Sequence, residues 1–160
     1  MDVRFVNPFV SAVRNVFHTM LGVEVKIDKP YIKSDNEALA DVSGIIGFSG
    51  DATGCLVLSF PRKVAERTAS KFAGTEITEA HPDFPDALGE LANMIAGNAK
   101  KDFEGVHISI SLPSVVVGEN HRISKSNAFP RLVIPCETPL GRFFLEVAMK
   151  IEKEVPVGVR

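Results

Sequence analysis

The sequence predicts an α+β fold in which helices pack against one antiparallel sheet of about six strands. Segments with a helical spacing of apolar residues alternate with groups of extended segments, and the order of one helix followed by three strands occurs twice. We therefore expect two α-β-β-β pseudo-repeats. The chain has 160 residues, of which 45% are hydrophobic, which suits one globular domain that we expect to span residues 1–160.

The first half begins with a helix that packs on the core. Asn7 and Pro8 suit the cap and first position of a helix, and Gly22 suits its end. Three extended stretches follow, at residues 23–27, 38–50 and 54–60. The last two flank the turn-rich residues 51–54, so we expect them to form a hairpin.

The second half repeats this order after a short connecting helix. The connecting helix is predicted over residues 62–72, with Gly74 as its stop. A longer helix over residues 86–100, with Asp83 as its candidate cap, precedes extended stretches at 107–118, 131–137 and 141–149. The last two stretches flank the turn sequence TPLG and should form a second hairpin.

The helix over residues 86–100 carries the candidate functional site. At about 100° per residue, the apolar positions Leu88, Leu91, Ala92, Ile95 and Ala99 form one stripe. Glu90, Asn93 and Gly97 fall near the opposite pole, where Asn and Gly cost helix stability and need a reason. We interpret this face as a surface with few bulky side chains that another protein approaches closely. Glu90 and Asn93 are three positions apart, so their head groups can contact one bound molecule. The other predicted partner contacts are Gly97, Asp86 and Gly89.

Other interpretations must be weighed. Glu90 and Asn93 could simply be solvated polar residues, which is the usual state of such side chains on a helix surface. The four histidines show no metal-ligand spacing, and no G-x-S-x-G elbow or phosphate loop is present. Cys55 and Cys136 are expected to be reduced and buried.

Charge and hydropathy exclude two classes of partner. The chain has 18 Lys and Arg against 20 Asp and Glu, a net charge of −2 with no basic block, so we expect no nucleic-acid binding. No apolar stretch approaches the roughly 20 residues of a spanning helix, and no signal-peptide pattern occurs at the start. We therefore expect no membrane association and a cytoplasmic location.

Three stretches together resemble a known family. The sequences NPFVSAVRNVFHTMLGVEV, GFSGDATGCLVLSFP and DALGELANMIAGNAK are similar to the CheX-type members of the CheC/CheX/FliY group of bacterial chemotaxis phosphatases. The specific part is E-x-x-N at Glu90 and Asn93, followed by Gly97 and Asn98. CheC-type relatives carry a second E-x-x-N on the first helix, whereas Ala12 and Asn15 occupy the matching place here. This departure favours the single-site CheX branch.

The resemblance implies a fold, an activity and partners. It implies a CheC-like fold and hydrolysis of the aspartyl phosphate of a CheY-like response regulator. Asn93 would position the attacking water, and Glu90 would pair with a lysine of the receiver domain. Mg²⁺ would be supplied by the receiver, and this chain would bind no cofactor or metal. A homodimer formed through the sheets is also implied.

Two alternatives stay open at this stage. The first is a binding module of the same fold that docks a receiver domain or a signalling complex without catalysis. The second is a structural dimer in which Glu90 and Asn93 have no function. The segments GRFFLEVAM and SLPSVVVG are apolar and lightly charged, so both are predicted edge strands that a second copy could cover.

Overall fold

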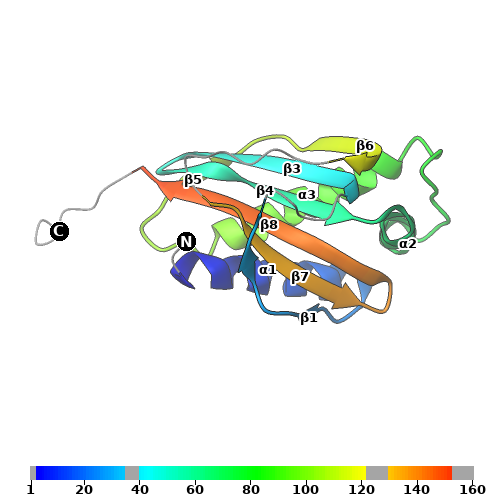
Figure 1. Ribbon diagram of the computed structural model, residues 1–160, viewed down its shortest axis with the longest axis horizontal. Coiled ribbons are helices and arrows are strands. Elements are labelled where there is room, and N and C mark those ends of the chain that lie inside the picture. The colour runs from blue at the N-terminus through cyan, green and yellow to red at the C-terminus, as the bar shows by residue number, and fades with distance from the viewer. Residues whose placement is uncertain (1–2, 35–39, 122–129, 153–160) are drawn as a thin grey trace, which may run out of the picture.

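The computed structural model describes residues 3–34, 40–121 and 130–152 (Figure 1). Three helices form within these ranges: α1 (Val3–Leu21), α2 (Arg62–Ala73) and α3 (Phe84–Lys100). The strands formed by the described residues are β1 (Lys26–Ile27), β2 (Tyr31–Ile32), β3 (Ala40–Gly50), β4 (Ala52–Phe60), β5 (Ile108–Ile110), β6 (Ser114–His121), β7 (Leu132–Thr138) and β8 (Gly141–Ile151). The predicted α+β class and antiparallel sheet are confirmed.

The sheet has a two-fold pseudo-symmetric topology. Its order is β1-β7-β8-β4-β3-β5, with β2 also paired to β7 and β6 also paired to β3, and all pairs are antiparallel. The hairpins β3–β4 and β7–β8 meet at the central pair β4–β8. The short strands of each half pair with the hairpin of the other half, so the two repeats are interlocked.

The two long helices cover the same face of the sheet. The Phe9 ring of α1 lies 5.9 Å from the Phe48 ring of β3, and the Phe17 ring lies 4.8 Å from the Phe143 ring of β8. The start of α1 meets the chain just beyond the end of α3, where the rings of Phe9 and Phe103 are 5.5 Å apart. The helices are therefore antiparallel to each other, while α2 lies at one end of the sheet (Figure 1).

The structure corrects the predicted start of the first helix. The helix begins at Val3, so Pro8 lies inside it and Asn7 is not its cap. The extra turn is stabilised by packing, because the Phe5 ring lies 5.8 Å from the ring of Phe103.

The described residues form eight strands rather than about six. The stretch over residues 23–27 forms only the two-residue strand β1, and β2 was not predicted. The stretch over residues 107–118 divides into β5 and β6 around Pro113, which has no N–H to donate to a neighbouring strand.

The prediction that GRFFLEVAM forms an edge strand is wrong. This segment is β8, which lies between β7 and β4 near the middle of the sheet. Its residues from Phe143 to Ala148 are buried or half-buried on both faces of the sheet, which accounts for the apolar character of this central strand. The segment SLPSVVVG, in contrast, contributes β6, which among the described strands pairs with β3 alone and lies at an edge.

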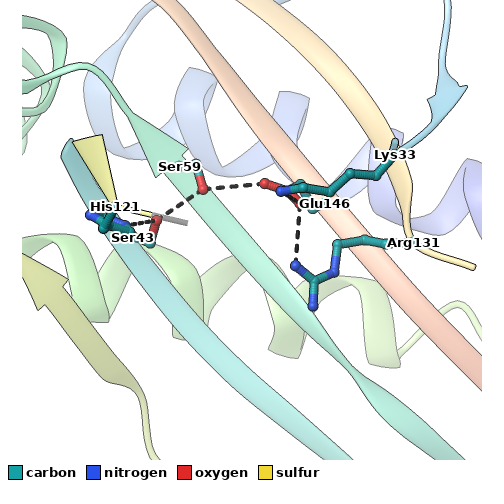
Figure 2. Close-up of polar contacts among 6 residues, drawn as sticks. All are labelled: Lys33, Ser43, Ser59, His121, Arg131 and Glu146. Carbon is teal, nitrogen blue, oxygen red and sulfur yellow. Dashed lines mark hydrogen bonds and ion pairs between the residues drawn. The ribbon is translucent and has the colours of Figure 1, made fainter. Parts of the chain in front are cut away.

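A row of polar side chains crosses the face of the sheet opposite α1 and α3 (Figure 2). The buried Glu146 carboxylate of β8 accepts a 2.7 Å hydrogen bond from the Lys33 ammonium. Arg131 Nη1 and Ser59 Oγ each lie 3.5 Å from this carboxylate. Further contacts join Ser59 Oγ to Ser43 Oγ at 3.0 Å and Ser43 Oγ to His121 Nε2 at 2.7 Å. The row therefore links both repeats.

Both cysteines are free thiols, as predicted. Cys136 is buried and Cys55 is half-buried. Burial raises the pKa of the Cys136 thiol to about 12, so this thiol stays protonated near neutral pH. Of the helices formed by the described residues, none combines the length and apolar character needed to cross a membrane.

We expect Gly54→Ala to destabilise the fold strongly. Gly54 has a φ of +147°, and a Cβ there would collide with the carbonyl oxygen of Ala148 on β8. The substitution should lower the free energy of unfolding by at least about 2 kcal/mol, because both the conformation and the central β4–β8 pair are disturbed. Urea unfolding monitored by circular dichroism measures this difference.

Gly97→Ala is the matched control. A Cβ at Gly97 meets nothing within 4 Å, and the residue lies inside α3. This variant should gain up to about 1 kcal/mol from helix propensity. Equal effects of the two substitutions would contradict the account of the central pair.

Candidate functional site

The candidate site lies on α3, which packs closely on β3. A Cβ built at Gly44 of β3 would lie 3.2 Å from Cβ of Ala92 and 3.4 Å from the carbonyl oxygen of Leu88. Small residues on both elements let the helix approach the sheet. Asp83 occupies the position before the helix, as predicted, although its side chain makes no capping hydrogen bond.

The predicted faces of α3 are confirmed. The apolar stripe is buried, with relative exposures of 0–1% at Leu88, Leu91, Ala92, Ile95 and Ala99. On the other side of the helix, Glu90 is exposed and Asn93 is half-buried. Because the two residues are three positions apart, their side chains are neighbours on the helix surface.

Both side chains are available to a partner. Within residues 3–34, 40–121 and 130–152, neither the Glu90 carboxylate nor the Asn93 amide makes a hydrogen bond or ion pair. The backbone that carries them is fixed by the packing of α3 on the sheet. The arrangement thus presents one carboxylate and one neutral amide from a rigid element, as a positioning site requires.

Asn93 lines an open groove of about 380 Å³ that Glu90 does not line. Gly97 lies on the same groove, and a Cβ at this position would meet nothing within 4 Å. Lys101 is the charged residue of the lining, which also includes Asn15, Thr19 and Met20 of α1, Met94 and Asn98 of α3, and Ile110 of β5. The groove therefore offers amide and apolar groups beside Asn93.

The two remaining predicted contact residues differ in exposure. Asp86 is exposed in the first turn of α3. Gly89 is buried, and a Cβ there would lie 3.2 Å from Val115 Cγ2 and 3.4 Å from the ring of Pro113. The absence of a side chain at Gly89 therefore has a packing explanation within this chain.

The predicted match between the first helix and the site needs correction. Ala12, which was aligned with Glu90, is fully buried and faces the core. The burial pattern instead places Ser11 and Arg14 on the exposed face of α1. Neither is a carboxylate or an amide. Asn15 is also exposed, but no residue of α1 is a carboxylate, so α1 does not repeat the pair found on α3.

Several residues of the groove could not be found from the sequence. Asn15 and Met20 come from α1, which is far from α3 in the chain, and Ile110 comes from β5. Their side chains carry no motif, and only the fold places them beside Asn93. Helical spacing finds the face of one helix, but it does not find a groove formed by three elements.

Metal ligands do not cluster in the part of the chain that the structure describes. No group of three or more His, Cys, Asp or Glu side chains there could hold an ion. His18 is exposed on α1 and pairs with Glu24 at 2.7 Å, while His121 belongs to the polar row. The histidines are thus engaged in separate contacts.

Known proteins are similar to this chain in fold and in sequence. The family model for chemotaxis phosphatase CheX matches residues 42–137. The CheY-P phosphatase CheX of Thermotoga maritima is 32% identical over 137 residues, which are 84% of this chain and 88% of that protein. A CheC-like superfamily protein from Shewanella sp. PV-4 has a TM-score of 0.86 and 33% identity, covering 94% of this chain and 99% of that chain.

A further relative has been solved in a complex. The CheX-CheY-BeF₃-Mg²⁺ complex from Borrelia burgdorferi contains a chain with a TM-score of 0.78 and 27% identity, covering 91% of this chain and 97% of that chain. The matched family model and the identity to the Thermotoga protein establish the assignment that the E-x-x-N helix suggested. The chain belongs to the CheX family of chemotaxis phosphatases.

Proposed function

We propose that this chain hydrolyses the aspartyl phosphate of a CheY-like receiver domain. The observation that carries the proposal is the pair Glu90 and Asn93, which project from one face of α3 and have no hydrogen-bond or ion-pair partner within the described residues. The Thermotoga relative is named a CheY-P phosphatase, and the Borrelia relative forms a complex with CheY. Both names support the same substrate for this chain.

Asn93 positions the attacking water in this proposal. An amide offers a donor and an acceptor on one short side chain, so it can hold a water in line with phosphorus while staying neutral. A carboxylate in the same place would repel the phosphoryl oxygens. The half-buried setting of Asn93 restricts its side chain, which favours a fixed position for that water.

Glu90 has a docking role. Its carboxylate is exposed and lies one turn nearer the start of α3, outside the groove that Asn93 lines. Pairing with a lysine of the receiver would fix the register of docking. Asp86, one turn further toward the helix start, adds negative charge on the same side.

The partner supplies the metal in this proposal. The Borrelia complex contains Mg²⁺ and BeF₃ together with CheY. Phosphoryl transfer is catalysed largely by positioning and by neutralising charge, and a receiver that binds Mg²⁺ provides the second of these itself. This chain then contributes side chains for docking and water positioning, with no metal or cofactor of its own.

A non-catalytic docking module of the same fold is the alternative. The exposed face of α3 would serve docking equally well. Catalysis requires that a substoichiometric amount of this chain speeds loss of phosphate from the receiver, whereas docking alone does not. Three further expectations stay predictions: a single domain over residues 1–160, a homodimer and a cytoplasmic location.

Asn93→Ala should abolish the acceleration of receiver dephosphorylation. Loss of a positioning group in a reaction of this kind costs a factor of about 10² to 10³ in rate. Phosphate release from a ³²P-labelled receiver measures it, while binding to the BeF₃⁻-activated receiver should persist. Asn7→Ala removes an exposed amide on α1 outside the groove and should keep the full rate. An unchanged rate in Asn93→Ala would rule out the proposed mechanism.

Glu90→Ala should weaken docking as well as rate. Removing one partner of an intermolecular charge pair typically raises the dissociation constant by about tenfold or more. Titration of the BeF₃⁻-activated receiver by isothermal calorimetry gives this constant. Glu104→Ala, which removes an exposed carboxylate beyond the end of α3, is the matched control. Equal affinities of the two variants would contradict the docking role of Glu90.

Gly97→Phe should block the partner without unfolding the helix. The space above Gly97 is open, so a large side chain fits this chain but fills the groove beside Asn93. We expect receiver binding to fall by about two orders of magnitude, as for a steric block at the centre of an interface. Gly97→Ala, which adds one methyl group, is the size control. Full binding by Gly97→Phe would show that the receiver does not lie over this turn.

A further inference from the structure

Leu112 is the most exposed large hydrophobic residue in the part of the chain that the structure describes. Its relative exposure is 88%, whereas the next, Ile32, is 53% exposed. It lies between β5 and β6, in the short connection Ser111–Pro113. A leucine held in solvent contributes nothing to the core of the isolated chain, so its position calls for another explanation.

The connection around Leu112 is fixed by hydrogen bonds. The Ser111 N–H donates to the Gly47 carbonyl at 2.9 Å, and the Gly47 N–H donates to Ser111 Oγ at 2.8 Å. The Ser111 hydroxyl in turn donates to the carbonyl oxygen of Leu112 at 2.9 Å. The backbone of Leu112 is thereby tied to β3, so the exposed side chain is presented from an ordered position.

The neighbours of Leu112 contact the candidate site from the edge of the sheet. Pro113 packs against Gly89, the residue before Glu90, at 3.4 Å from a Cβ built there. Ile110, which precedes Leu112 by two residues, lines the same groove as Asn93. Leu112 therefore lies along α3, beside the turns that carry Glu90 and Asn93.

We infer that Leu112 is an apolar anchor for the receiver domain that docks on α3. This inference rests on the proposed function and adds a specificity residue outside the E-x-x-N motif. Interfaces concentrate binding energy in a few apolar or aromatic side chains surrounded by polar contacts. Leu112 supplies that apolar contact beside the polar residues Glu90 and Asn93, and its partner is an apolar patch near the phosphorylated aspartate of the receiver.

A second patch of exposed apolar residues provides a comparison. Tyr31 and Ile32 belong to β2, which pairs with β7 in the half of the sheet opposite β5 and β6. Because α3 contacts β3 and β6, this second patch lies away from Glu90 and Asn93. Ile32→Asp therefore introduces the same charge at an exposed apolar residue far from the proposed interface.

The test measures the affinity of the full chain for a receiver domain from the same genome, activated with BeF₃⁻ and Mg²⁺. Leu112→Asp should raise the dissociation constant by at least about tenfold, and Leu112→Ala by about threefold. Ile32→Asp should change it less than twofold. At saturating phosphorylated receiver, the rate of dephosphorylation by Leu112→Ala should equal that of the unmutated chain, because Leu112 does not touch the reacting atoms. Urea unfolding checks that each variant is folded. If Leu112→Asp is unfolded, the affinity of Leu112→Ala decides the test.

The outcomes separate this inference from the proposed function. If both Leu112 variants bind the receiver normally, the inference fails, although a loss of rate in Asn93→Ala would still support the phosphatase. If the unmutated chain binds but does not accelerate dephosphorylation, and Leu112→Asp weakens binding, Leu112 is confirmed as an anchor and the catalytic proposal fails. Absence of receiver binding by the unmutated chain overturns both. If Leu112→Asp halves the mass in light scattering and leaves receiver binding unchanged, a second copy covers Leu112 and the inference is wrong.

Discussion

The backbone pairing of β4 with β8 is the interaction on which the rest of the structure depends. It runs from the pair Ala52–Ile151 to the pair Ser59–Phe144 and is the only direct junction between the two hairpins among the described strands. Each hairpin takes its outer neighbours from the other repeat, so these contacts are also non-local. Without the central pair, the sheet under α1 and α3 would divide into two parts. The close approach of Gly54 to the Ala148 carbonyl shows how tightly the strands meet there.

The polar row on the opposite face gives this junction a defined register. Glu146 is paired with Val57 across the central pair, and its buried carboxylate meets the Lys33 ammonium at 2.7 Å. A buried charge is costly unless its partners are in place, so a shift of β8 along β4 would leave Glu146 and Lys33 without each other. A one-residue shift would also turn Glu146 toward the helices, into the apolar core. We therefore expect the main effect of the row to be on the choice of strand register.

The sequence predicts features that depend on one segment, and it does not predict features that depend on contacts between several segments. Every residue of the predicted α3 stripe is buried, because helical spacing assigns each residue of one helix to a side; Phe84, Ala87, Gly89 and Ala96 are buried as well. The central position of β8 was missed, since an apolar strand buried on both faces looks the same as an apolar edge awaiting a partner. The start of α1 depends on the contact of Phe5 with Phe103, about a hundred residues away. The groove beside Asn93 and the position of Leu112 have the same origin in tertiary contacts.

The pseudo-symmetry of the sheet does not extend to the helices, and this explains why the candidate pair occurs on α3 and not on α1. The two repeats are equivalent in the sheet, since β1 and β2 pair with β7 in the same way as β5 and β6 pair with β3. The helices differ, because α3 projects a carboxylate and an amide whereas the exposed face of α1 carries Ser11 and Arg14. Instead of a second pair, α1 contributes Asn15, Thr19 and Met20 to the groove beside Asn93. The helix of the first repeat thus shapes the environment of the candidate pair on the helix of the second.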